Sequence, residues 1–390
     1  SGISQGSNAL ISNTLGEGRK EKAKKYSRQA ISFGFIVAII ITCIGFAISP
    51  FLFRFLGAKE EYLQLSLDYM NVILLGTIFF LTQSILNASL LAQGDSKSFR
   101  NVLIVGFFMN LLFNPILMYG FGPIPALGIK GISLATVLIQ FIGTIYMGYK
   151  VSKTKLWNEF NPKNLIPMKS YYKDIAHQGF PASLNMMTVA LGIFIITFFA
   201  SKFGNSGVAA YGIATRVEQM ILVPSIGLNM ALISLVGQNN GAKKLGRVKE
   251  AIKKTLKYGA FLEIPGGVLL FIFANKMMGL FTEDIEVIAL GTQYLRISAF
   301  VLFGYIILFQ MVAMMQGLKK PFFGLSVGLL RQIILPIIIF PLLSQVLGLG
   351  ILGIWIGIAI IIVLSAIIVL IIALSFLRKR IEYVEKLKTD

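Results

Sequence analysis

Long apolar segments separated by short polar stretches dominate this chain, and they decide what it can fold into. A helix needs about 20 apolar residues to cross the roughly 30 Å hydrocarbon core of a membrane. Inside lipid, every backbone polar group must bond within the protein, which helices achieve. We therefore expect an all-α integral membrane protein with spanning helices near residues 31–53, 66–92, 100–120, 128–149, 178–200, 207–236, 257–281, 288–315, 322–344 and 350–377, and with residues 1–15 as the end of one more.

The composition supports this expectation and disfavours an enzyme. Hydrophobic residues make up 56% of the chain and charged residues only 14%, against about 25% charged in soluble domains. With one cysteine, Cys43, and one histidine, His177, the chain lacks the residues for a disulfide, a zinc site or a histidine-based catalytic dyad. We expect no enzymatic activity and no cofactor.

Basic residues gather in alternate loops. The net charge is +19, and most Lys and Arg residues lie at 19–28, 97–100, 150–173, 243–257, 319–320 and 378–388. Cytoplasmic loops of membrane proteins collect Lys and Arg, so we expect these loops and the C-terminus to be cytoplasmic in a plasma or inner membrane, touching lipid headgroups. Because the basic loops are short and separated by spans, we expect no nucleic-acid partner.

The chain resembles itself at an offset of about 225 residues. Residues 15–34 align with 240–259, Tyr69 aligns with Tyr294, and LGIKGI (127–132) aligns with LGILGI (349–354). Both halves start on the same side of the membrane, as in parallel repeats. The repeat predicts two pseudo-symmetric six-helix lobes, of which the first helix and most of the second would precede Ser1. The expected parts are an incomplete N-lobe (1–149), an inter-lobe linker (150–177), a C-lobe (178–378) and a cytoplasmic tail (379–390).

Four segments resemble the multidrug and toxic compound extrusion (MATE) transporters. They are GVAAYGIATRVEQMILVPSIGLNMALISLVGQNNGAKKLGRVKEA (207–251), QGDSK (93–97), NLLFNPILMYG with GIKGISLAT (110–136), and GFPAS (179–183). The resemblance implies a monomeric secondary antiporter that exports organic cations or related amphipathic compounds in exchange for H⁺ or Na⁺ by alternating access. The alternative within the same superfamily is a flippase for lipid-linked saccharide precursors, which needs a cationic cavity for pyrophosphate.

Glu218 is the clearest ionisable residue in the middle of an apolar segment. Such residues are costly in a membrane and mark functional sites by default. We expect Glu218 to bind the coupling ion, H⁺ or Na⁺, in competition with a cationic substrate; the alternative is a structural carboxyl that bonds to another helix. Arg216 is two positions away on the same helix and therefore points to a different side from Glu218. We expect it to bind a substrate group; the alternative is a structural cation bonded to backbone carbonyls.

Asn110 and Asn114 are spaced i, i+4 on one helix face, just before Pro115. Two amides and a freed carbonyl suit Na⁺ or a water chain. By the family resemblance Asn110 and Thr136 match N-lobe site residues, whereas Asn114 stands where an Asp is expected. The alternative is interhelical hydrogen bonding by both asparagines. In the seventh-helix segment Asn185 is a polar candidate, while Glu263, Arg296 and Arg331 are expected near helix ends, where their side chains reach the interface.

Overall fold

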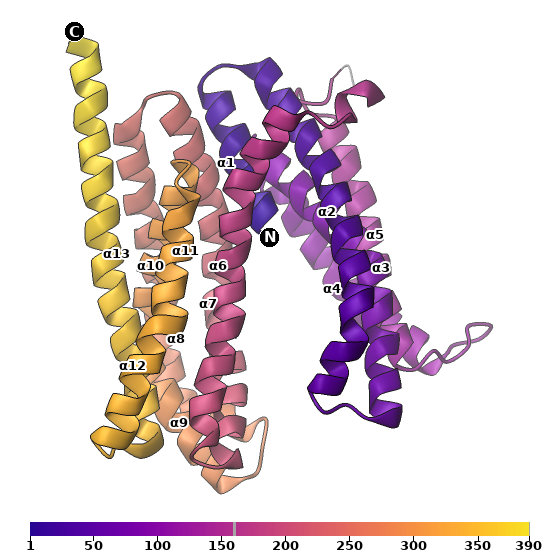
Figure 1. Ribbon diagram of the computed structural model, residues 1–390, viewed down its shortest axis with the longest axis vertical. Coiled ribbons are helices and arrows are strands. Elements are labelled where there is room, and N and C mark those ends of the chain that lie inside the picture. The colour runs from indigo at the N-terminus through magenta and orange to yellow at the C-terminus, as the bar shows by residue number, and fades with distance from the viewer. Residues whose placement is uncertain (159–160, 390) are drawn as a thin grey trace. The chain divides into compact units, whose positions relative to one another are not determined.

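The computed structural model describes residues 1–158 and 161–389, which are almost entirely helical. The α-helices are α1 (Gly2–Gly16), α2 (Lys20–Phe55), α3 (Glu60–Leu91), α4 (Lys97–Tyr119), α5 (Ile129–Ser152), α6 (Lys169–Ser201), α7 (Asn205–Gly241), α8 (Leu245–Gly279), α9 (Ile285–Ala299), α10 (Leu302–Gly317), α11 (Pro321–Leu329), α12 (Leu335–Pro341) and α13 (Gly350–Thr389). A 3₁₀ turn covers Pro162–Leu165, and π-helical segments cover Leu330–Ile334 and Leu342–Val346. Figure 1 shows their order along the chain.

The predicted membrane spans are confirmed in number and position. Among the described residues, nine helical stretches are long and apolar enough to cross a membrane, or ten if the bent pair α9 and α10 forms one span. The apolar side chains of α2 and α4 are largely exposed on the protein surface, as expected of lipid-facing helices. The protein is therefore a multi-pass membrane protein.

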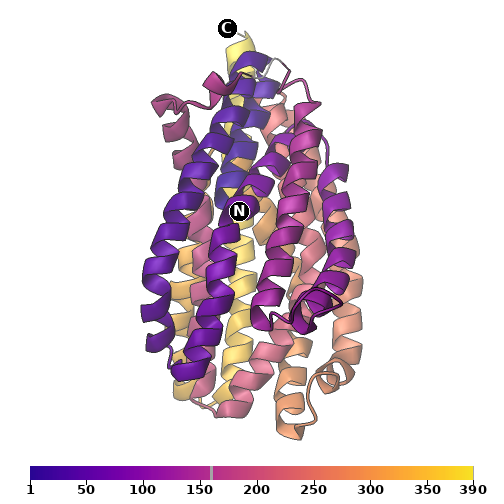
Figure 2. The ribbon, with the colours of Figure 1, turned by 90° about the vertical axis from the view of Figure 1, so that its right-hand side faces the viewer.

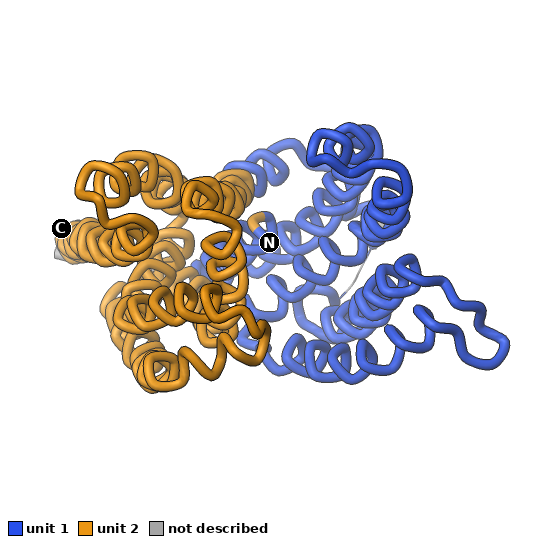
Figure 3. The backbone as a smooth tube through the Cα atoms, turned by 90° about the horizontal axis from the view of Figure 1, so that it is seen from below, with its two compact units in different colours: residues 1, 3–177 blue, residues 2, 178–390 orange. Residues whose placement is uncertain are grey.

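The chain divides into two compact units, residues 1 and 3–177 and residues 2 and 178–390 (Figure 3). In unit 1, α3 packs against α2 and α5, and α5 packs in turn against α4. Figure 2 shows these long helices side by side. In unit 2, α7 packs against α8, α9 and α10, and α10 packs against α13. The predicted lobe, linker and tail boundaries stay predictions, and their residues 159, 160 and 390 lie outside the described residues.

The polar segment after α5 is held against α2 by hydrogen bonds within unit 1. The Gln29 amide donates to the carbonyls of Asn164 and Ile166 and accepts from the Met168 backbone N–H. The Trp157 indole donates to Ser27 Oγ over 2.9 Å, and the Tyr26 hydroxyl donates to Asp174. Buried polar groups that are satisfied in this way fix the path of a segment that lacks long apolar runs.

The internal repeat is confirmed by the ends of the helices. α1 ends at Gly16 and α7 at Gly241, α2 begins at Lys20 and α8 at Leu245, and α3 begins at Glu60 and α9 at Ile285. Each pair is separated by the offset found in the sequence. Two helices in each unit also end in the same cap, with a positive φ at Gly18, Gly94, Lys243 and Lys319.

In each of these caps, the residue after the positive-φ position donates its N–H to a carbonyl five residues earlier. The bonds join Arg19 to Thr14, Asp95 to Leu90, Lys244 to Asn239 and Lys320 to Met315. This is the Schellman arrangement, which satisfies carbonyls at a helix end. Glycine adopts the left-handed conformation without penalty, so the lysines of unit 2 are the less favourable residues there.

Several helices differ from the sequence-based expectation. α2 begins at Lys20 instead of 31, and α8 begins at Leu245 instead of 257. α6 begins at Lys169 instead of 178, because the amphipathic stretch before the apolar run is also helical. The expected helix 288–315 is broken into α9 and α10, which are bent by 55°. The expected helix 322–344 contains two π-helical segments. Hydropathy locates apolar residues but is insensitive to such changes in the hydrogen-bond ladder.

Candidate functional site

Glu218 lies at the centre of a hydrogen-bonded group inside unit 2. Its side chain on α7 is only 4% exposed. The Tyr294 hydroxyl donates to Glu218 Oε2 over 2.8 Å, and the Ser298 hydroxyl donates to Oε1. Tyr294 and Ser298 are one turn apart on α9, so a single helix face presents both donors.

Aromatic side chains pack around Tyr294, one of the two donors to Glu218. The Tyr294 ring meets the rings of Tyr211 and Trp355 edge-on, with centroid distances of 5.7 and 5.2 Å. The Tyr211 and Trp355 rings stack on each other at 6.0 Å. Such apolar surroundings strengthen hydrogen bonds to Glu218 and make loss of a donor costly. Sequence reasoning missed these partners; the polar residues Tyr294 and Ser298 in an apolar segment were the available signal.

The two arginines near this site differ in their surroundings. Arg216 on α7 is exposed, and none of the ion pairs found among the described residues involves it. Arg331 was expected near a helix end, and this was wrong. It lies in the π-helical segment Leu330–Ile334, between α11 and α12, with its guanidinium 5.8 Å from the Tyr305 ring centroid.

The structure joins Asn110 and Asn114 by a hydrogen bond, and Thr136 bonds within its own helix. The Asn114 amide donates to Asn110 Oδ1, while Asn114 Oδ1 is buried without a hydrogen-bond partner. Thr136 on α5 donates to the Ile132 carbonyl of its own helix over 3.1 Å. The two asparagines thus form one polar patch on α4 that retains an unused acceptor.

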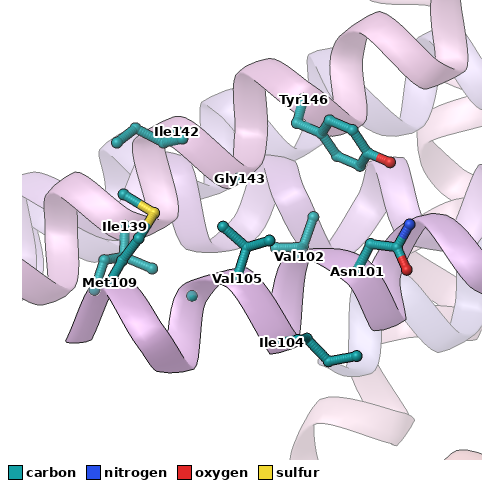
Figure 4. A pocket seen from close by; sticks show the side chains of 10 residues that line it. Asn101, Val102, Ile104, Val105, Met109, Ile139, Ile142, Gly143 and Tyr146 are labelled. Atoms are coloured by element: carbon teal, nitrogen blue, oxygen red, sulfur yellow. The ribbon is translucent and has the colours of Figure 1, made fainter. Parts of the chain in front are cut away.

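A pocket of about 420 Å³ opens between α4 and α5 in unit 1 (Figure 4). Most of its lining is aliphatic, with Met109 and Ile139 at one end and Asn101 and Tyr146 at the other. Pockets that bind drug-sized molecules have a similar size and the same mixture of apolar walls and a few polar groups. Lys150 does not line the pocket, but its Nζ lies 5.5 Å from the centroid of the Tyr146 ring.

Asn185 lies at a contact between α6 and α11. A Cβ atom on Gly328 would come within 2.3 Å of Asn185 Oδ1 and 2.5 Å of Thr188 Oγ1. Gly324 approaches the same asparagine. These small residues let the two helices approach closely, as is common in membrane proteins. Asn185 therefore packs between helices in this structure.

Glu263 is a buried carboxyl group that sequence reasoning placed wrongly. We expected it near a helix end, but α8 begins at Leu245, so Glu263 lies in the middle of the helix and is only 1% exposed. The Ser225 hydroxyl of α7 donates to Glu263 Oε1, whereas Oε2 has no hydrogen-bond partner. The basic stretch that begins α8 hid this position, because hydropathy counted only the apolar part of the helix.

Comparison with known proteins decides the family. The sequence profile of the MatE family matches residues 1–116 and 181–342. The chain belongs to the MatE family. Members of this family are transporters and not enzymes, which confirms both the resemblance and the expectation that the chain is not an enzyme.

Several relatives of this MatE chain cover most of its length. It is 26% identical over 349 residues to a FAD transporter of Shewanella oneidensis, covering 89% of this chain and 77% of the relative. It is 26% identical over 365 residues to the probable multidrug resistance protein YoeA of Bacillus subtilis, covering 91% and 78%. A solved MOP superfamily transporter from Pyrococcus furiosus shares the fold, with 24% identity, a TM-score of 0.90, and coverage of 98% and 84%.

Proposed function

We propose that this protein is a secondary active antiporter that exports organic cations or related amphipathic compounds in exchange for H⁺ or Na⁺. The observation that carries the proposal is the buried Glu218 carboxyl group with its two hydroxyl donors on α9. A carboxylate inside a membrane protein needs a cation, a proton or several donors to be stable. Exchange results when the coupling ion and the cationic substrate bind to this carboxylate in turn, each replacing the other.

The hydroxyl donors suit Glu218 to this exchange. Serine and tyrosine hydroxyls donate to a carboxylate but also accept hydrogen bonds or ligate a cation, because each carries lone pairs as well as a proton. The same group can therefore hold H⁺ on Glu218, or Na⁺ among the carboxylate and hydroxyl oxygens. Asn110 and Asn114 offer a second oxygen-rich place for Na⁺ in unit 1, with one acceptor unused.

Two features, one in each unit, support the substrate class. In unit 2, Glu218 supplies a negative charge. In unit 1, the pocket between α4 and α5 has apolar walls with an amide and a phenol at one end. Aromatic and thioether groups adapt to flat organic cations. A relative named as a multidrug resistance protein supports this class. We propose a monomer in the plasma or inner membrane, in contact with lipid and with a cytoplasmic C-terminus, which alternates in access by movement of two lobes.

A second candidate substrate is an anionic amphiphile. One relative is named a FAD transporter, and FAD carries a pyrophosphate group, as do the lipid-linked saccharides carried by a flippase. Arg331 and the exposed Arg216 would have to bind this group. The Arg331 guanidinium already lies over the Tyr305 ring, and the carboxyl group of Glu218 repels an anion, so a cation is favoured over an anion at this site.

Transport into inverted membrane vesicles tests the proposal. Vesicles containing the protein are incubated with an organic cation dye such as ethidium. An H⁺ gradient, a Na⁺ gradient or no gradient is imposed across their membrane. We expect accumulation of the dye with one of the two gradients and none without a gradient. Uptake of FAD or a lipid-linked pyrophosphate, together with no dye transport under either gradient, would contradict the proposal.

A further inference from the structure

Glu263 is the second carboxyl group buried in unit 2, and nothing in the exchange at Glu218 requires it. Its side chain on α8 is as inaccessible as the apolar core, at 1% exposure. Its one hydrogen-bond donor is Ser225, which leaves Oε2 buried and unpartnered. An ionised carboxylate with a single donor is costly in such a place, whereas a protonated carboxyl group is not.

Glu263 is connected to Glu218 through one face of α7. Ser225 lies seven residues after Glu218, two turns along the same face of the helix, which is about 10 Å along its axis. This face of α7 therefore carries the Glu218 carboxyl group and, two turns further on, the Ser225 hydroxyl that donates to Glu263. Pro224 and Pro265 lie close to the contact, so both helices lack one backbone hydrogen bond there.

Glu263 has no ion-pair partner among the described residues. α8 packs against α7, α9, α10 and α13, and the donor that reaches Glu263 is the uncharged Ser225 hydroxyl of α7. A negative charge on either of the carboxyl groups of Glu263 and Glu218 disfavours one on the other.

We propose that Glu263 is a second proton-binding site, which stores a proton and exchanges it with Glu218 during the transport cycle. In this step the O–H bond at Glu263 Oε2 breaks and an O–H bond forms on a Glu218 oxygen, and water molecules relay the proton over the distance between the two carboxyl groups. The negative charge moves from Glu218 to Glu263, and no electron is transferred to another group. The role in transport depends on the proposed antiport, whereas the proton on Glu263 does not.

Infrared difference spectroscopy of the purified full-length chain tests the proton on Glu263 directly. A protonated carboxyl group gives a C=O stretching band that an amide or a carboxylate lacks. We expect a pH step to reveal such a band in Glu218→Gln, where Glu218 itself cannot contribute one, and we expect Glu263→Gln to remove it in that background. The matched control is Glu286→Gln, whose exposed carboxylate accepts from Ser206 Oγ over 2.6 Å; it should retain the band.

Vesicle transport then tests the role of the stored proton. Glu263→Gln keeps an acceptor for Ser225 and a similar volume, so it preserves a purely structural contact. We expect dye transport driven by an H⁺ gradient to fall at least tenfold in this variant and to remain unchanged in Glu286→Gln.

The outcomes separate the two proposals. Full transport by Glu263→Gln, or an unchanged infrared band in that variant, would overturn the inference. A band that depends on Glu263, in a wild-type protein that moves no cation, would support the proton site and contradict the antiport.

Discussion

At the residue scale, the hydroxyl of Tyr294 decides how well Glu218 holds its charge. Tyr294→Phe removes the donor to Oε2 and keeps the ring between Tyr211 and Trp355. A hydrogen bond to a charged group contributes about 1.5–3 kcal/mol, so we expect gradient-driven transport to fall roughly tenfold to a hundredfold. The measurement is the initial rate of dye uptake in vesicles at equal protein content.

The control for Tyr294→Phe is Tyr305→Phe, which keeps the ring beside the Arg331 guanidinium and leaves both bonds to Glu218 in place. We expect nearly wild-type transport from it. Equal rates in the two variants would show that the Tyr294 hydroxyl has no special part in ion binding.

Asp95, in the short loop before α4, supports the start of that helix. Its carboxylate accepts from Ser98 N over 3.0 Å and from Ser98 Oγ over 2.6 Å. Partial burial acts to raise the pKa of Asp95, but the hydrogen bonds from Ser98 and Lys97 and the charge of Lys150 together outweigh it, and the pKa is lowered. We expect Asp95→Ala to reduce the free energy of unfolding by about 1 kcal/mol, and Asp95→Asn to reduce it less.

The lowered pKa also gives the sign of a pH dependence. A carboxyl group with a lower pKa in the folded state stabilises that state above its unfolded pKa, near about 4. The stabilisation is lost as the pH falls through the folded value. In detergent, the unfolding temperature of the wild type should be higher than that of Asp95→Asn at neutral pH. The two temperatures should be equal under strongly acidic conditions. A difference that grows as the pH falls would contradict this assignment.

At the element scale, the four equivalent helix caps of the repeat allow a paired test. A non-glycine residue in the left-handed conformation costs about 1–2 kcal/mol, and Lys243 has a φ of 57°. Lys243→Gly removes this cost and loses about 0.3–1 kcal/mol from a cation at a helix C-terminus. We expect it to raise the unfolding temperature, with a net gain of about 0.5–1 kcal/mol.

The matched variant at the same place in the first repeat is Gly18→Ala. No atom lies within 4 Å of a Cβ at Gly18, so the substitution tests backbone conformation alone. We expect it to lower the unfolding temperature. Changes of the same sign in Gly18→Ala and Lys243→Gly would show that the caps do not have the same conformation in the two repeats.

Hydropathy and the internal repeat predicted the number of spans and their order, because long apolar runs leave few alternatives in a membrane. Helix ends were harder to predict. The basic first turns of α8 and the polar start of α6 are helical by packing and hydrogen bonding, which a count of apolar residues does not detect. Glu263 was misplaced for this reason.

The candidate site was predicted only in part. Glu218 could be found from its cost in a membrane, but its partners Tyr294 and Ser298 are about 80 residues away in sequence. Only the packing of α7 against α9 brings them together. Asn110 and Asn114 were predicted to share a face because they lie on one helix, and they do.

At the scale of the whole molecule, the alternation of basic loops predicts the orientation in the membrane. Cys43 is the one cysteine of the chain, so a Cys43→Ser background allows single cysteines to be placed at exposed sites. We expect a cysteine at Lys249 to react with a membrane-impermeant maleimide only after the cells are opened. A cysteine at Lys59 should react in intact cells, and the reverse pattern would contradict the proposed topology.

The most direct test of the central claim is dye transport by Glu218→Gln in vesicles with an imposed H⁺ or Na⁺ gradient. The amide keeps the size of the side chain and accepts one of the two hydroxyl hydrogen bonds, but it cannot bind a coupling cation by charge. With Glu286→Gln as the matched control, we predict that Glu218→Gln folds and loses nearly all gradient-driven transport while the control retains it. Unaltered gradient-driven transport by Glu218→Gln would contradict the account.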